Sequence, residues 1–311
     1  MKTKEEIYLD EVKRASELDE KFAKNITKDS DKLQGIMRSQ LFAIYNSIKD
    51  KLAPAYRNAP ASQKNSAFTQ ISTQGNKNAY AATLQEELAR VAFEAQLAAK
   101  ASLPIAIRRK LSEESMTFSA PRGGFFGALS PKIRRLVKSQ AALISETQVY
   151  DLEKVVYFQF ASSAAASESI ETILNDIDSK VNPTLVEDSI KAGNIATAAG
   201  DAVAQVANQT WIETYFEPDA FDAIESFTFV NEDPVSEICQ ALEGTTLAPG
   251  DPDFMRYQTP LHHNCKSHWE PNFKGSKDSP DIERDGLSLS KKALGSITLA
   301  ENAVHQVFSR E

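Results

Sequence analysis

Residues 260–269, Pro-Leu-His-His-Asn-Cys-Lys-Ser-His-Trp, form the stretch that most constrains the fold of this 311-residue chain. They contain three of its four histidines and one of its two cysteines, Cys265, while the other cysteine, Cys239, precedes them. A module of roughly fifty residues buries too little apolar surface to build a large core of its own. The gathering of thiols and imidazoles therefore predicts a small C-terminal module that these side chains staple together.

A tetrahedral zinc site is one form that such a staple can take, because zinc binds thiolate and imidazole ligands. The predicted ligands are two cysteines and two histidines: Cys239, His262, Cys265 and His268. His263 could take the place of His268. The alternatives left open are a surface histidine cluster, a loop held by hydrogen bonds around one disulfide, and a catalytic metal. His305 is interpreted as an ordinary helical residue.

The rest of the chain is predicted to be helical. Gly and Pro, at 12 and 13 residues, are scarce, and apolar residues recur at helical spacing over residues 7–22 and 33–48. A break is expected near residues 29–31, and Ala53-Pro54 is expected to end the helix, since proline disfavours helical dihedrals just before it. Further helices are expected over residues 79–101, 130–139, 149–160, 167–180 and 183–216, with Ser130-Pro131 and Asn182-Pro183 as cap and first-turn pairs.

The pattern changes after Pro218. Residues 224–230 alternate as a strand does, Asp233-Pro234 is predicted to cap a short helix that Gly244 ends, and residues 246–257 are expected to form a loop or hairpin. Residues 116–130 are expected to be irregular, and residues 290–308 to form a terminal helix. The fold class is thus mainly α, an elongated helical N-terminal body with a small α+β Cys/His-stapled C-terminal module. The expected regions are an N-terminal helical region (1–120), a central helical region (121–218), the Cys/His module (219–275) and a tail (276–311).

Charge is distributed unevenly along the chain, whose net charge is −8. No Lys or Arg occurs over residues 192–255, while residues 201–253 hold twelve acids, which argues against uniform DNA binding. The basic residues predicted to contact nucleic acid or an acidic partner are Arg108, Arg109, Lys110, Lys132, Arg134, Arg135 and Lys138. Two solvated faces of opposite charge are the alternative interpretation.

No secretory signal is visible near the N-terminus, and the longest uncharged apolar stretch, residues 155–167, is too short to cross a bilayer. Folding in a reducing cytoplasm is expected, and the two cysteines leave open one disulfide in an oxidising medium.

Residues 227–244, Phe-Thr-Phe-Val-Asn-Glu-Asp-Pro-Val-Ser-Glu-Ile-Cys-Gln-Ala-Leu-Glu-Gly, followed by residues 260–267, Pro-Leu-His-His-Asn-Cys-Lys-Ser, resemble the C-terminal domain of the phage Mu F-like minor head proteins. The matching positions are Asp233, Cys239, Leu242, Gly244, Pro260, His262 and Cys265, and Lys266 stands where Arg is usual. Two positions depart from the pattern, because Ser236 and Ser267 stand where that family has cysteine. A site of four thiolates is therefore excluded, and a zinc site relies on His268.

The resemblance implies a structural, non-enzymatic head-morphogenesis protein of a tailed bacteriophage, made in the host cytoplasm and present in the virion in few copies. Its expected partners are the portal protein, the major capsid protein and packaged double-stranded DNA, with no membrane involved. The alternatives are a zinc-stabilised adaptor and a nuclease-like protein. The nuclease reading is weakened because His262, His263 and Asn264 are contiguous, whereas such enzymes spread these groups over a hairpin and a helix.

Overall fold

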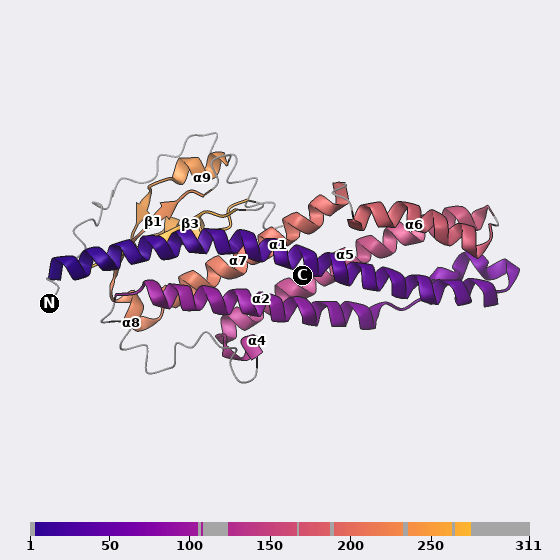
Figure 1. Cartoon of the computed structure of the whole chain (residues 1–311), viewed down its shortest axis with the longest axis horizontal. Coiled ribbons are helices and arrows are strands. Elements are labelled where there is room, and N and C mark those ends of the chain that lie inside the picture. Colours follow the sequence, from indigo (N-terminus) through magenta and orange to yellow (C-terminus); the bar gives the residue numbers. More distant parts are fainter. Residues whose placement is uncertain are drawn as a thin grey trace. The chain divides into compact units, whose positions relative to one another are not determined.

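The computed structural model describes residues 4–104, 107, 124–166, 168–186, 190–232, 236–262 and 265–274. The chain forms two compact units, each assembled from separate segments. The first unit contains Met1–Asp29, Arg90–Ile133 and Gly200–Glu311, and the second contains Ser30–Ala89 and Arg134–Ala199. Most described residues are helical, and a small antiparallel sheet lies toward the C-terminus (Figure 1), so the predicted fold class is confirmed.

Helix α1 (Lys4–Asn58) crosses both of its expected breaks without interruption. Asp29 is buried, and its carboxylate accepts a 2.6 Å hydrogen bond from the Arg90 guanidinium of α2 (Gln74–Ser102). The positive charge of Arg90 compensates the buried carboxylate, so α1 continues through this position. Pro54 lies within the last turns of α1, where the missing N–H removes a single backbone hydrogen bond. Burial of Leu52 and Tyr56 on either side offsets that loss, and the prediction that the helix ends at Pro54 is wrong.

The second unit is built from helices alone among its described residues. After α1 come a 3-10 helix, η1 (Ala61–Gln70), and the beginning of α2. Helix α5 (Pro131–Ala165) is one helix where two were predicted, because residues 140–148 contain no helix breaker and bury Ala141 and Ile144. The predicted cap is confirmed, since the Ser130 hydroxyl accepts a 3.2 Å hydrogen bond from the Ile133 N–H.

The prediction that Asn182-Pro183 starts a helix is wrong. Helix α6 (Ile170–Val186) runs through both residues, and α7 (Ile190–Tyr215) begins after them. Near the end of a helix the same argument as for Pro54 holds, because the ring costs one backbone hydrogen bond while the rest of the turn persists. None of the described helices has a stretch that is long and apolar enough to span a bilayer.

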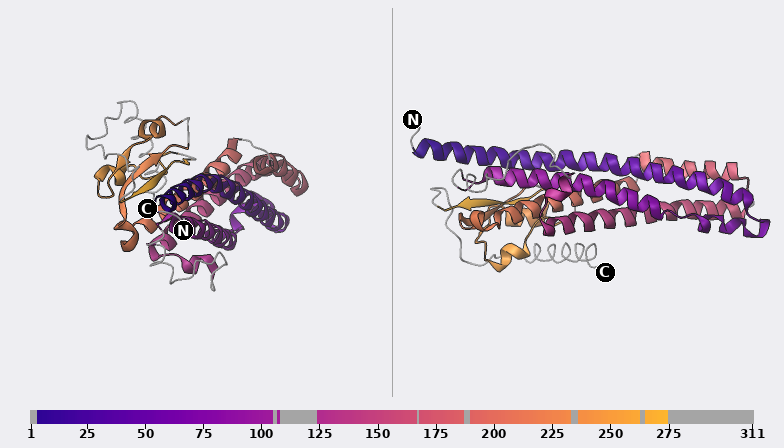
Figure 2. Two further views of the ribbon diagram at one scale, coloured as in Figure 1. Left: turned by 60° about the vertical axis from the view of Figure 1, so that its left-hand side comes forward. Right: turned by 90° about the horizontal axis from the view of Figure 1, so that it is seen from below.

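The C-terminal module lies in the first unit and contains a three-stranded antiparallel sheet of order β2-β1-β3. Strand β1 (Ile224–Val230) is where the alternation predicted it, and it pairs with β2 (Thr246–Leu247) and β3 (His268–Phe273). Figure 2 shows this sheet, in orange and yellow, from two further sides. Three short helices accompany the sheet: α8 (Pro218–Phe221), α9 (Glu237–Leu242) and α10 (Pro252–Arg256).

Four aromatic side chains form the core of this module. Phe227 stacks on Phe254 with ring centroids 4.6 Å apart, and Trp269 meets Phe229 edge-on at 5.1 Å. All four are fully or almost fully buried, and the Trp269 indole N–H donates to the Tyr257 carbonyl at 2.9 Å. Burial of aromatic side chains, which remove large apolar areas from water, stabilises the module.

Three other expectations fall wholly or partly outside the described residues. Residues 116–123 of the predicted irregular segment belong to this group, whereas Gly124–Ala128 forms the short helix α4. The predicted tail over residues 276–311, with its terminal helix over residues 290–308, lies outside the described residues as well.

Candidate metal centre

Cys239 is positioned by the first turn of α9. The N-cap of this helix is Ser236, whose hydroxyl accepts a 3.4 Å hydrogen bond from the Cys239 N–H. The predicted cap at Asp233 is therefore wrong for this helix, and Asp233 itself lies outside the described residues. A serine at the N-cap satisfies a backbone donor that the helix leaves free, which fixes the direction of the Cys239 side chain.

The other end of α9 is held against β1. Gly244 has a φ of +72°, a conformation that favours glycine, and this confirms it as the residue that ends the helix. Its N–H donates to the Phe229 carbonyl at 3.0 Å, and the Phe229 N–H donates to Thr245 at 2.8 Å. Because Leu242 is also fully buried, α9 and Cys239 are held firmly against the sheet.

His262 and Cys265 lie on the segment that connects α10 to β3. Within this segment the Cys265 N–H donates to the His262 carbonyl at 3.2 Å. This hydrogen bond brings the two side chains to one side of the segment. Ser267 then ties the segment to the end of β1. Its hydroxyl accepts a 3.3 Å hydrogen bond from the Glu232 N–H. The same hydroxyl donates a 3.3 Å hydrogen bond to the Asn231 side-chain oxygen.

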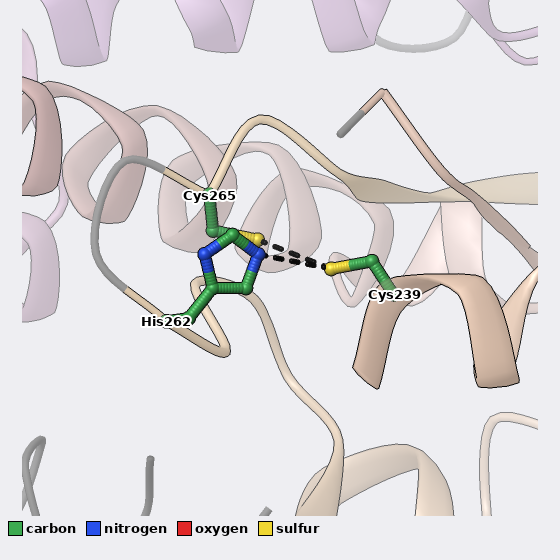
Figure 3. A group of neighbouring side chains, drawn as sticks. All are labelled: Cys239, His262 and Cys265. Atoms are coloured by element: carbon green, nitrogen blue, oxygen red, sulfur yellow. Dashed lines mark hydrogen bonds between the residues drawn. The ribbon is translucent and has the colours of Figure 1, made fainter. Parts of the chain in front are cut away.

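These elements bring Cys239, His262 and Cys265 together (Figure 3). The Cys239 Sγ lies 3.1 Å from the His262 Nε2 and 3.9 Å from the Cys265 Sγ, and all three ligand atoms lie within 4.8 Å of one another. Both cysteines are fully buried, whereas His262 is partly exposed. Such a group could hold a metal ion, because two sulfurs and one ring nitrogen converge on one small volume.

The two thiols have opposite tendencies to ionise. The hydrogen bond to Cys265, together with burial, raises the pKa of Cys239, whereas the hydrogen bond from Cys239 lowers the pKa of Cys265. Of the two thiols, Cys239 is therefore the harder to ionise, because its pKa is raised while that of Cys265 is lowered. Cysteine binds a metal as the thiolate, so a divalent cation bound here would displace the thiol protons.

His268 does not belong to this group. It lies at the beginning of β3, opposite Val230, and its side chain is 1% exposed. Its Nε2 lies 3.5 Å from a Glu270 carboxylate oxygen. Among the described residues, three of the four predicted ligands therefore come together. His268 is the exception, because β3 begins at this residue and its pairing with Val230 of β1 fixes the position of the imidazole. His263, the predicted substitute, lies outside the described residues.

The predicted basic residues are described only in part. Lys132, Arg134, Arg135 and Lys138 lie in the first turns of α5, and Arg135 and Lys138 are exposed. Lys132 lies 3.7 Å from the Glu213 carboxylate. The predicted contacts Arg108, Arg109 and Lys110 lie outside the described residues.

Sequence reasoning noted Ser236 and Ser267 only as departures from a family pattern and missed what they contact. Ser236 precedes an acidic residue and an apolar pair, which is a recognisable helix-start signal. Ser267 had no such signal, because its partners Asn231 and Glu232 are distant in sequence. Comparison of this chain with protein-family models, with curated proteins and with solved structures gave no match.

Proposed function

We propose that Cys239, His262 and Cys265 hold one zinc ion whose role is to brace the C-terminal module. The donor set supports zinc over magnesium or calcium, since thiolates are soft ligands and those two cations prefer oxygen. Burial of both sulfurs supports a structural role, because a shielded site exchanges its metal slowly and offers a substrate little access. The ion would link α9 to the segment before β3 and so close the module across its core.

We further propose that the protein is a structural, non-enzymatic minor head protein of a tailed bacteriophage, located inside the capsid near the portal vertex. The observation that carries this proposal is the convergence of Cys239, His262 and Cys265, three positions at which the sequence resembles the Mu F-like family. Cys239 is distant in sequence from His262 and Cys265, and the three were predicted to be ligands of one site. Their meeting is what a shared module architecture requires.

The exposed basic residues of α5 support a role in contacting packaged DNA or an acidic partner. Arg135 and Lys138 are exposed on the same helix, and Arg134 is partly exposed. Long basic side chains on an exposed helix neutralise phosphates without reading sequence. Such contact suits a protein that lies beside packaged DNA of arbitrary sequence.

The metal proposal is tested by elemental analysis of the purified chain, which should contain about one zinc per molecule. Cys265→Ser should lose the metal and loosen the module, because a hydroxyl is a poor zinc ligand. His268→Gln is the matched control, since His268 lies on the next strand outside the group, and it should retain zinc. Zinc retained by Cys265→Ser, or lost on His268→Gln with the fold intact by circular dichroism, contradicts the proposed ligand set.

The virion proposal is tested by mass spectrometry of purified particles released by the host that carries the gene. The chain should co-purify with the portal and major capsid proteins in few copies per particle, and its absence from intact particles would contradict the proposal. A nuclease is the alternative that the same preparation can expose. Metal-dependent DNA cleavage that is lost on His262→Ala would replace the structural role with an enzymatic one.

A further inference from the structure

The two sulfurs of the candidate metal centre face each other with no other side chain of the group between them. The Cys239 Sγ and the Cys265 Sγ lie 3.9 Å apart, about 2 Å more than the length of a disulfide bond. We propose that this pair is a redox switch, in which oxidation joins Cys239 to Cys265 and expels the metal. The proposal rests on the proposed zinc centre for its metal-bound state and on the sulfur geometry alone for its oxidised state.

The arrangement of the two cysteines favours bond formation. Cys239 is fixed by the capped first turn of α9, whereas Cys265 lies on a segment without helix or strand, just before β3. The two sulfurs have to approach by about 2 Å to form the bond, and the approach is expected on the Cys265 side, where the backbone belongs to no helix or strand. No other pairing competes within one molecule, because these are the only two cysteines of the chain.

The metal-bound and disulfide states exclude each other. A sulfur that enters a disulfide loses the negative charge that makes it a zinc ligand. Of the three grouped ligands His262 alone would remain, and one imidazole holds zinc weakly. Both states nevertheless link the same two positions, so the module stays closed across the stretch between Cys239 and Cys265 in a reducing and in an oxidising medium.

The oxidant must be small, because both sulfurs are fully buried and only His262, 3.1 Å from the Cys239 Sγ, is partly exposed beside them. Hydrogen peroxide meets this requirement. One thiolate attacks the O–O bond, which breaks to give a sulfenic acid and hydroxide, and the second thiolate attacks that sulfur and displaces a second hydroxide. Two protons convert the hydroxides to water. The two sulfurs lose two electrons, the peroxide gains them, and one zinc ion leaves.

The experiment uses the full-length, zinc-loaded chain treated with hydrogen peroxide under native conditions. Zinc release is followed with a chromophoric chelator, free thiols are titrated after denaturation, and a non-reduced digest is searched for the peptide that joins Cys239 to Cys265. We expect one zinc released per disulfide formed, with loss of both thiols. Dithiothreitol should restore the thiols and zinc binding, and His268→Gln should behave as the unmodified chain does.

Three outcomes overturn the switch: zinc retained while the thiols are lost, oxidation to sulfinic or sulfonic acid without a disulfide, or a disulfide only between molecules. The metal-free chain separates this inference from the proposed zinc site. A chain that never binds zinc contradicts the metal centre, yet a Cys239–Cys265 disulfide formed in it still supports the redox pairing. Persistence of two free thiols under peroxide in that chain would overturn the pairing as well.

Discussion

At the residue scale, two serines form hydrogen bonds with the backbone and with a side-chain amide at positions where the Mu F-like pattern has cysteine. Ser236 caps α9 through the Cys239 N–H, and Ser267 ties the segment after Cys265 to Asn231 and Glu232. In each case a hydroxyl satisfies backbone or amide groups that a thiol would satisfy less well. The cluster therefore keeps three ligand side chains, and the two serines hold those ligands in place.

The cap makes a prediction about stability. Ser236→Ala should lower the free energy of unfolding by about 1 kcal/mol, because one helical N–H loses its partner. Urea titration followed by tryptophan fluorescence would measure this change, since the buried Trp211 and Trp269 both lie in the first unit. Ser236→Asp should retain most of the stability, since a carboxylate caps equally well. Ser162→Ala, at an exposed position on α5, is the control and should change little. An alanine variant as stable as the parent would show that the cap contributes nothing.

At the element scale, the features that could be predicted are those with a local cause. The alternation of β1, the Ser130 cap and the glycine that ends α9 each depend on a few neighbouring residues, and the structure confirms them. The continuity of α1 through Pro54 could not be read from the sequence, because packing of Leu52 and Tyr56 decides it. A proline signal describes one lost hydrogen bond and says nothing of the burial that offsets it.

The same division applies to the candidate site. Cys239, His262 and Cys265 could be proposed from their chemistry and spacing, while the place of His268 depends on a strand that was not predicted. Strand β3 contains Glu270 and Pro271, which strands disfavour, and pairing with β1 stabilises it. Pro271 is tolerated because β3 is an edge strand in the order β2-β1-β3.

Within the second unit, α1 and α6 are joined by one partly buried polar cluster. Asp178 accepts a 2.5 Å hydrogen bond from the Tyr45 hydroxyl and binds Lys49 through both carboxylate oxygens at 2.7 Å. Burial and the hydrogen bond to Asp178 raise the pKa of Tyr45. Arg57 and Glu171 also join these helices, at 2.7 Å, but both side chains are more than half exposed.

Asp178→Asn should lower the free energy of unfolding by about 1–2 kcal/mol, because it removes the charge that two donors share while keeping the side-chain shape. Glu171→Gln is the matched control between the same helices, and water screens that pair enough to leave no measurable change. Urea titration monitored by circular dichroism, together with amide hydrogen exchange in α6, gives the change in the free energy of unfolding for each variant. Equal effects of the two substitutions would contradict the importance assigned to burial.

At the scale of the whole molecule, both compact units are discontinuous in sequence. Helices α1, α2, α5 and α7 each contribute residues to both units, so the boundaries between the units fall inside helices. A division into consecutive regions follows composition, whereas the units follow contacts between distant segments. Neither Pro/Gly content nor charge along the chain carries that information. The acidic residues 201–253 lie in the first unit, while of the predicted basic residues Arg134, Arg135 and Lys138 lie in the second and Lys132 in the first.

If the basic residues of α5 neutralise phosphates, binding of the chain to a short DNA duplex should weaken steeply as salt rises. Each phosphate contact contributes about 0.9 to the slope of log affinity against log salt concentration, so Arg134→Glu and Arg135→Glu should each reduce the slope by about 1. Lys154→Glu changes the charge equally at an exposed position farther along α5 and is the control. The salt slope counts the phosphates that basic side chains contact, whereas each of these substitutions changes the net charge by the same amount. Only the arginine variants should therefore change the slope. A slope that responds equally to Lys154→Glu would assign the effect to net charge and leave α5 without a DNA-facing role.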